Sequence, residues 1–261
     1  MISLGGHVGM HEQHSSNSMV HVEAGMRSSL IVKTMLRPIP HQVALTAFTE
    51  AFTALDELAT SLDDILLMRS SRCQGWAVCD VLYHLHLGAQ DVLVALALPT
   101  EAEPDSDFVS VWRGNDAGTD TALANVHFVR LVASAYRKPT ALVAHLSATV
   151  RAVVRRAGEV PKDTRIEQGG QVLSVGDFLA QWAVEAAIHH LDITVDLGDV
   201  VAPAASALAV VQRTFDGLAG SAVDLGWDDV TYALKGSGRL PLAESERKEL
   251  GPLANRFPLI G

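Results

Sequence analysis

A carboxylate and an imidazole lie one helical turn apart in the segment SVGDFLAQWAVEAAIHHLDITVDL, residues 174–197. Apolar residues recur at helical spacing along this segment, so the side chains of Glu185 and His189 are expected on the same side of a helix. Burying both groups among apolar neighbours costs free energy unless they have polar partners. The two residues are therefore either a solvated or hydrogen-bonded pair without metal, or two ligands of a divalent metal ion.

A third metal ligand would have to come from another helix, and the segment AVCDVLYHLHLGAQDVLVALAL, residues 77–98, offers His84 and His86. Positions two apart on an α-helix differ by about 200° in direction, so the two imidazoles cannot both face one site. Each histidine shares its stripe of the helix with both apolar and polar neighbours. The periodicity of the segment therefore leaves the choice between them open.

The elements that must position these residues are predicted to be amphipathic helices, because apolar residues recur at intervals of three and four. A long polar loop is expected between the second helix and the third. Four long helices with one long crossover are typical of a four-helix bundle, a fold that builds metal sites from facing helices. The predicted helices cover residues 43–67, 77–98, 121–158 (broken near Pro139) and 174–197.

Two local signals refine this bundle. Ser174 is the expected N-cap of the last helix, with Asp177 three residues later to return the hydrogen bond. Gly169 and Gly170 predict the turn of a short hairpin within residues 164–175.

The predicted fold class is mainly α, in three segments. Residues 1–40 lack a core-forming pattern and are expected to be a disordered extension or the result of a start codon placed too far upstream. Residues 41–199 are predicted to form the metal-binding four-helix bundle. Residues 200–261 are predicted to form a small α+β appendage, in which VTYAL, residues 230–234, is a strand.

Composition narrows the class of protein. The net charge of −10 argues against nucleic-acid binding, which needs a basic face. The sequence has no apolar run long enough for a signal peptide or a membrane span, so no membrane partner is expected. The two cysteines, Cys73 and Cys79, do not have the spacing of a zinc ribbon or a redox motif, and so small a number favours the reducing cytoplasm. Either a monomer or a homodimer is compatible with these features.

Two segments of the sequence resemble the signatures of the mycothiol-dependent maleylpyruvate isomerase N-terminal domain family, which belongs to the DinB-like helical bundles. Residues 75–91 resemble its "GW-x-V-x-D-x-x-x-HL" signature, and residues 185–198 resemble its Glu-x-x-x-His-x-x-Asp signature. The resemblance covers about residues 42–198 in helix order. The matched positions are Gly75, Trp76, Val78, Asp80, His84 and Leu85 in the first signature, and Glu185, His189 and Asp192 in the second.

The resemblance implies that His84, Glu185 and His189 are the metal ligands. Two imidazoles and one carboxylate leave coordination positions open, as in catalytic zinc sites. A thiol bound at such a position loses its proton at neutral pH, and the thiolate is a nucleophile. The resemblance therefore implies a divalent metal, with Zn²⁺ as the first expectation, and mycothiol as a cosubstrate. The expected reaction is an isomerisation or an S-transfer on a small electrophile.

Three further residues are candidates for the site. Asp192 is expected to orient His189 through its other ring nitrogen, with a solvated residue near the helix end as the alternative. Trp182 is the candidate for contact with the cofactor, with packing in the core as the alternative. Arg239, in the appendage, is a candidate to bind a substrate carboxylate.

The sequence also departs from the family pattern. Ala77 stands where a serine or threonine N-cap is common, which should weaken that helix start by about 1 kcal/mol. His86 and His190 are additional histidines, expected in the core or at the rim of the site. Two other classes of function stay open: a non-catalytic helical binding module with a structural or vestigial metal site, and a metal-dependent hydrolase.

Overall fold

The computed structural model describes residues 38–113, 120–198 and 200–260 of the 261-residue chain. The predicted N-terminal extension, residues 1–40, therefore lies almost wholly outside the described residues. Its last part belongs to the bundle, because Ile39 is only 3% exposed and its backbone N–H donates to Asp177 Oδ1 at 3.1 Å.

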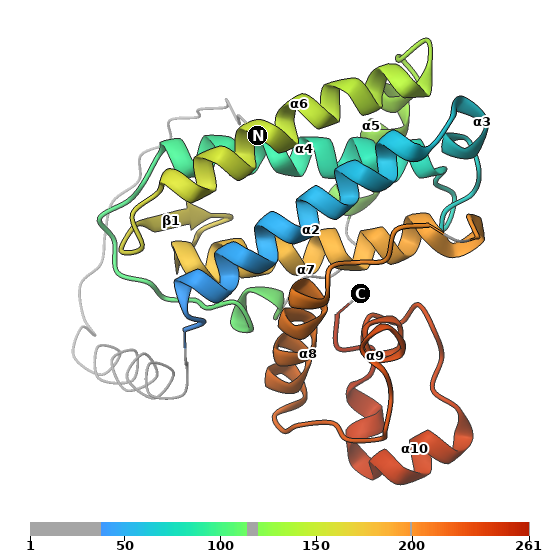
Figure 1. Cartoon of the computed structure of the whole chain (residues 1–261). Coiled ribbons are helices and arrows are strands. Elements are labelled where there is room, and N and C mark those ends of the chain that lie inside the picture. Colours follow the sequence, from blue (N-terminus) through green and yellow to red (C-terminus); the bar gives the residue numbers. More distant parts are fainter. Residues whose placement is uncertain (1–37, 114–119, 199, 261) are drawn as a thin grey trace, which may run out of the picture. The chain divides into compact units, whose positions relative to one another are not determined.

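Four long helices form the body of the described chain (Figure 1): α2, α4, α6 and α7. α2 packs against both α6 and α7, and α4 packs against α6 and α7. Phe48, Phe52 and Leu55 of α2 are fully buried at these contacts. The elements of this part are α2 (His41–Ser61), α3 (Asp64–Leu67), α4 (Val78–Ala97), η1 (Ser110–Trp112), α5 (Asp120–Ala133), α6 (Pro139–Glu159), β1 (Arg165–Gln168), β2 (Gln171–Ser174), α7 (Val175–Ile193) and η2 (Thr194–Asp196).

The predicted mainly α class and helical bundle are confirmed. The break near Pro139 is also confirmed, since α6 begins at this proline, which needs no hydrogen-bonded N–H in the first turn of a helix. The predicted hairpin is the antiparallel pair of β1 and β2, whose turn residues Gly169 and Gly170 have φ of 60° and 81°. Positive φ at both central residues suits the right-handed twist of a two-residue hairpin.

Helix α7 begins as the sequence predicts. The Ser174 side chain accepts a hydrogen bond from the backbone N–H of Asp177 at 3.1 Å. Most of α7 is buried, because α2, α4 and α8 all pack on it. α4, in contrast, begins at Ala77 without a side-chain cap, and only the return bond is made, from Ala77 N–H to Asp80 Oδ2 at 2.9 Å.

The C-terminal segment differs from the prediction. Residues 230–234, predicted to be a strand, lie within the helix α9, so the described part of the appendage is helical rather than α+β. Asp228 caps this helix through its side chain, which accepts from Thr231 N–H at 2.7 Å, and Tyr232 is buried against Phe215. The cap and this packing outweigh the β-propensity of Val230 and Thr231. The elements are α8 (Ala205–Ala219), α9 (Asp229–Gly236), α10 (Glu244–Leu250) and η3 (Gly251–Arg256).

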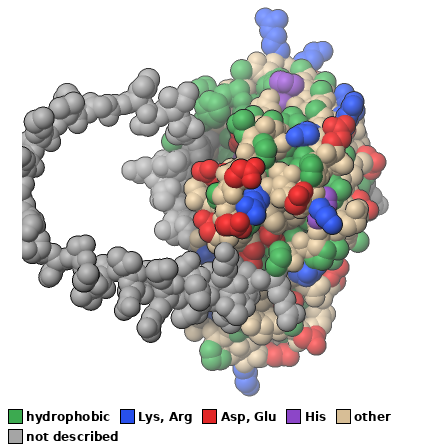
Figure 2. Space-filling view, turned by 90° about the vertical axis from the view of Figure 1, so that its left-hand side faces the viewer, with side chains coloured by type: hydrophobic (Ala, Val, Ile, Leu, Met, Phe, Trp, Pro, Cys, Tyr) green, Lys and Arg blue, Asp and Glu red, His purple; other side chains and the backbone are tan. Residues whose placement is uncertain are grey.

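Two features of the described residues concern the predicted absence of nucleic-acid and membrane partners: the charge of the surface and the apolar character of the helices. On the face that Figure 2 presents, acidic and basic side chains are interspersed among apolar ones. Among the residues that the structure describes, no helix combines the length and the apolar character that crossing a membrane requires.

Candidate metal centre

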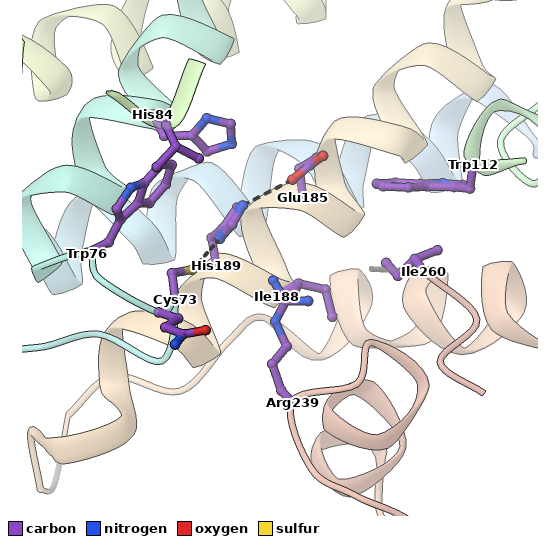
Figure 3. A pocket seen from close by; sticks show the side chains of 11 residues that line it. Cys73, Trp76, His84, Trp112, Glu185, Ile188, His189, Arg239 and Ile260 are labelled. Atoms are coloured by element: carbon purple, nitrogen blue, oxygen red, sulfur yellow. Dashed lines mark hydrogen bonds and ion pairs between the residues drawn. The ribbon is translucent and has the colours of Figure 1, made fainter. Parts of the chain in front are cut away.

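Two helices bring the three predicted metal ligands together. His84 projects from α4, and Glu185 and His189 project from α7 (Figure 3). One ligand atom from each lies within 4.8 Å of the others. The His84 and His189 rings meet edge to face, with centroids 4.9 Å apart, and His189 Nε2 lies 3.3 Å from Glu185 Oε2. The set is two imidazoles and one carboxylate at the wall of a cavity, and these residues fit a divalent metal ion.

The two histidines of α4 lie in different surroundings, His84 beside His189 and His86 beside His145. His86 is 2% exposed and stacks on His145 of α6, with ring centroids 4.3 Å apart. His190, the neighbour of His189, is 1% exposed, and its Nε2 lies 2.6 Å from the carbonyl oxygen of Val201. Both additional histidines are therefore engaged in the core, away from the triad.

The protonation states suit metal binding. Burial, and then the nearby His189, lower the pKa of His84 to about 4, so this imidazole is neutral at pH 7 and able to coordinate. Burial raises the pKa of Glu185, but its hydrogen bond to His189 and the charges of His189, His84 and Arg239 outweigh it, so the pKa is lowered and Glu185 is ionised.

His189 holds a proton in this arrangement. Burial lowers its pKa, but hydrogen bonds to Asp192, Cys73 and Glu185 outweigh burial and raise the pKa well above its ordinary value. A positive charge between Glu185 and Asp192 is thus favoured at this position. A metal cation would replace the proton on the side that faces Glu185.

Asp192 fixes the orientation of His189. It is fully buried, and its Oδ2 lies 2.9 Å from His189 Nδ1. Burial raises the pKa of Asp192, but hydrogen bonds to His189 and Arg239 outweigh burial and lower it below its ordinary value. The ionised carboxylate keeps Nδ1 protonated and leaves Nε2 directed at Glu185.

Arg239 reaches the same carboxylate from the C-terminal segment. Its Nε and Nη2 donate to Asp192 at 2.9 Å each, and its Nη1 donates to the carbonyl oxygen of Ser237 at 3.0 Å. Gly238, with φ of 72°, provides the turn that follows α9 and aims Arg239 back at the bundle. The side chain is 21% exposed and lines the same cavity as the triad, and its binding of a substrate carboxylate stays a prediction.

The cavity has a volume of about 330 Å³ and a mostly apolar wall. Trp112 and Ile260 close one side of it, and Trp76 stands on another side with its ring centroid 5.7 Å from that of His84 (Figure 3). Trp182 is not among the residues that line this cavity. It is 8% exposed and packs on Gly88 of α4, in the core position that was the alternative for this residue.

Cys73 and Trp112 line the cavity but were not among the site residues predicted from the sequence. Cys73 Sγ donates to Asp192 Oδ2 at 3.2 Å and lines the cavity. The signal for Cys73 was its place two residues before the Gly-Trp pair of the first signature. Trp112 was visible only as a tryptophan in the long polar loop, in which η1 forms.

The loop that carries Cys73 is held at both ends. Ser71 N–H donates to the carbonyl oxygen of Trp76 at 2.9 Å, and Arg72 N–H donates to the carbonyl oxygen of Asp192 at 2.9 Å. The loop is thereby attached to α7 beside the triad.

Residues 48–194 match the family model described as the mycothiol maleylpyruvate isomerase N-terminal domain. The chain belongs to this family. The match contains both helices that carry the triad, and it ends before Arg239. Comparison with curated proteins gives no significant match.

Two similar solved structures bear on the fold. One is a crystal structure of the mycothiol-dependent maleylpyruvate isomerase in which a histidine is replaced by alanine, with 13% identity and a TM-score of 0.50 over 69% of this chain and 72% of that one. The other is the mycothiol-dependent maleylpyruvate isomerase without that replacement, with 14% identity and a TM-score of 0.47 over the same shares of the two chains. At 13% identity, the first of these shows that the fold is shared.

Proposed function

We propose that this protein is a metal-dependent enzyme that uses a low-molecular-weight thiol, as an isomerase or S-transferase acting on a small electrophile. The observation that carries the proposal is the convergence of His84, Glu185 and His189 on one cavity that also holds Arg239. Family membership and the solved relatives, whose name includes mycothiol and maleylpyruvate, support mycothiol as the thiol and an unsaturated carboxylic acid as the substrate.

His84, Glu185 and His189 would hold the metal, and Zn²⁺ is the ion that we propose. A bound divalent ion lowers the pKa of a thiol, so that the nucleophilic thiolate is available at neutral pH. Two residues prepare this centre: Asp192 accepts a hydrogen bond from His189 Nδ1–H, and Arg239 balances the negative charge of Asp192.

Arg239 is also the residue that we propose for substrate binding. A guanidinium has five N–H groups, and its contacts with Asp192 and Ser237 leave N–H groups for a further acceptor. A carboxylate of the electrophile would accept from them and place the reactive carbon beside the triad. Trp76, Trp112 and Ile188 would limit the access of water, because they form much of the apolar wall.

The proposed setting is the reducing cytoplasm, with the chain as a monomer or homodimer. Both cysteines are free thiols in the structure, Cys73 partly buried and Cys79 buried, which agrees with a reducing compartment.

Metal content, measured by mass spectrometry on purified protein, tests the metal ligands. We expect about one equivalent of divalent metal in the wild type and a loss of most of it in His84→Ala, Glu185→Ala and His189→Ala, with helical circular dichroism retained. His86→Ala is the matched control on the same helix and should keep the metal. A wild type that binds no metal after zinc loading would overturn the proposal and leave a helical binding module.

Thiol dependence tests the reaction class. Zinc-loaded protein is mixed with maleylpyruvate, with and without mycothiol, and the ultraviolet spectrum is followed. Turnover only with mycothiol supports the proposal, and consumption or transfer of the thiol would distinguish a transferase from an isomerase. Thiol-independent turnover would contradict the proposal, and cleavage of the substrate by water would instead indicate a hydrolase.

A further inference from the structure

A second and larger cavity adjoins the candidate metal centre. It has a volume of about 790 Å³, and Trp76 lines both cavities. The loop that ends in Trp76 forms part of both walls: Cys73 and Gln74 face the smaller cavity, and Gly75 and Ala77 face the larger one.

Helix α5 forms a wall common to both cavities. Val126 lines the smaller cavity, whereas Arg130 and Ala133 of α5 and Ser134, the residue just after the helix, line the larger one. Val126, Arg130 and Ala133 are spaced by four and three residues, so they belong to one side of the helix. From Val126 to Arg130 the helix rises about 6 Å, and to Ala133 about 10 Å, at 1.5 Å per residue. The two cavities are therefore neighbours along α5, one to two helical turns apart.

The lining of the larger cavity is mixed, and a greater share of it is polar than in the smaller cavity. It combines three cationic side chains with two carboxylates and several hydroxyl groups, whereas the smaller cavity is mostly apolar. Asp64 accepts from Thr140 N–H and Asp80 accepts from Ala77 N–H, and each carboxylate has further acceptor capacity. The hydroxyl groups belong to Ser70, Ser71, Ser134 and Tyr136.

A hydroxyl-rich ligand suits this lining better than an anion does. Each hydroxyl of a polyol both donates and accepts, so it can use the cations, the carboxylates and the hydroxyl groups of the wall together. The carboxylates of Asp64 and Asp80 offset two of the three positive charges of the wall, and they give a hydroxyl-rich ligand acceptors that an anion could not use. The Nε1 of Trp76 is buried without a hydrogen-bond partner among the described residues, and the indole offers a flat apolar face between the two cavities.

The size of the smaller cavity also favours a second binding space for the thiol. Sites for drug-sized ligands measure about 300–1,000 Å³. At about 330 Å³, the smaller cavity lies at the lower end of this range, and a small acid together with the sulfur end of a thiol would occupy much of it. The rest of a hydroxyl-rich thiol would then need a neighbouring space.

We propose that the larger cavity binds the hydroxyl-rich part of the thiol cosubstrate, with the chain that carries the sulfur passing Trp76 to reach the triad. This inference rests on the proposed function, because it assigns a place to the thiol that the reaction requires. It makes the lining of the larger cavity, Arg130 and Ser134 in particular, the determinant of thiol specificity.

Binding measurements with two thiols test this inference. Calorimetric titration of the zinc-loaded protein with mycothiol is compared with titration by N-acetylcysteine, a thiol without a polyol. Ser134→Tyr fills the larger cavity and Arg130→Ala removes a donor. We expect Ser134→Tyr to weaken mycothiol binding at least tenfold, Arg130→Ala to weaken it severalfold, and neither to change N-acetylcysteine binding. Leu131→Tyr is the control, since Leu131 is 71% exposed on α5 and lines neither cavity.

The outcomes separate this inference from the proposed function. Equal loss of both thiols in Ser134→Tyr, or no loss of mycothiol in either variant, would overturn the inference while the metal and thiol chemistry stands. Competition with mycothiol by inorganic phosphate, but not by a thiol-free glycoside, would also overturn it, because the cavity would then be an anion site. A wild type that binds zinc but neither thiol would reject the proposed function itself.

Discussion

Asp192 is the residue on which the polar groups of the centre converge. Its carboxylate accepts from His189, Cys73 and Arg239, and its backbone oxygen accepts from Arg72 N–H. A buried carboxylate is costly unless it is paired, and the bidentate contact with Arg239 provides the charge that pairs it. The position of the His189 ring therefore depends on a residue that does not face the metal side of that ring.

Asp192→Asn should weaken metal binding about 10- to 100-fold, because the partner of a ligating histidine fixes its tautomer and direction. The measurement is a competition titration of zinc against a chromogenic chelator. Asp196→Asn, an exposed carboxylate four residues further along the chain, is the matched control and should bind zinc as the wild type does. Equal zinc affinity in both variants would show that Asp192 does not orient the ligand.

His86 predicts a dependence of stability on pH that is separate from the metal centre. Burial, and then the nearby His145, lower the pKa of His86 to about 4. The unfolded chain takes up this proton below about pH 6.5, whereas the folded chain takes it up only near pH 4. The contribution of His86 is therefore fully present above pH 6.5 and is lost as the pH falls toward 4.

Replacement of His86 should flatten this dependence. Between pH 6.5 and 4, the free energy of unfolding of His86→Leu should fall less steeply than that of the wild type, by up to about 1.4 kcal/mol per pH unit, the limit for one proton. Urea unfolding of the metal-free proteins at pH 4.5, 5.5 and 7 measures this difference. Parallel curves for the two proteins would contradict the prediction.

At the scale of the elements, close packing of α4 on α7 sets the spacing across which His84 meets His189. Gly88 of α4 lies against Trp182 of α7, and a Cβ at Gly88 would come within 2.3 Å of the indole. The tryptophan therefore fills the place that a larger residue on α4 would occupy. Its role is to fix the approach of the two helices that carry the triad.

Gly88→Ala should lower the free energy of unfolding by about 1–3 kcal/mol, since overpacking a core costs that much and outweighs the helix propensity of alanine. Gly158→Ala is the control: the added methyl group near the end of α6 meets nothing within 4 Å. It should be neutral or stabilise the protein by up to about 1 kcal/mol. Urea unfolding compares the two, and a Gly88→Ala variant as stable as Gly158→Ala would contradict the packing argument.

Much at this scale was predictable from local pattern. Apolar spacing predicts the helices, the break at Pro139 and the Gly169-Gly170 hairpin, because each depends on neighbours in the sequence. Tertiary contacts decide the rest. Val230 and Thr231 favour a strand locally, but the Asp228 cap and burial of the next turn form α9.

The candidate site was also only partly predictable, because tertiary contacts place several of its residues. Helical periodicity leaves His84 and His86 equivalent, and only the packing of α4 between α6 and α7 directs one to His189 and the other to His145. The family resemblance assigned His84 from the sequence signature, with no knowledge of this packing. Cys73 and Trp112 reach the cavity through loops, whose paths depend on contacts distant in sequence.

At the scale of the whole molecule, metal binding should couple to global stability. A ligand that binds only the folded state stabilises it by about 2.7 kcal/mol when its concentration is 100 times Kd. Zinc should therefore raise the melting temperature of the wild type by several degrees and leave that of His84→Ala unchanged. Calorimetry with and without a chelator measures the shift. An equal rise of the melting temperature in both proteins would show that zinc binds at a site other than the triad.

The C-terminal segment contributes to the candidate site, which therefore extends beyond the residues that match the family model. Its helix α8 packs on α2 and α7, and Arg239 beyond α9 pairs with Asp192. The match to the family model ends at residue 194, so residues 48–194 alone lack the cation that pairs with the buried carboxylate of Asp192. A chimaera that joined residues 48–194 to a foreign C-terminal partner would inherit the triad but not this cation. Exchange of such segments between proteins would thus succeed only where the new partner supplies a positive charge at the same place.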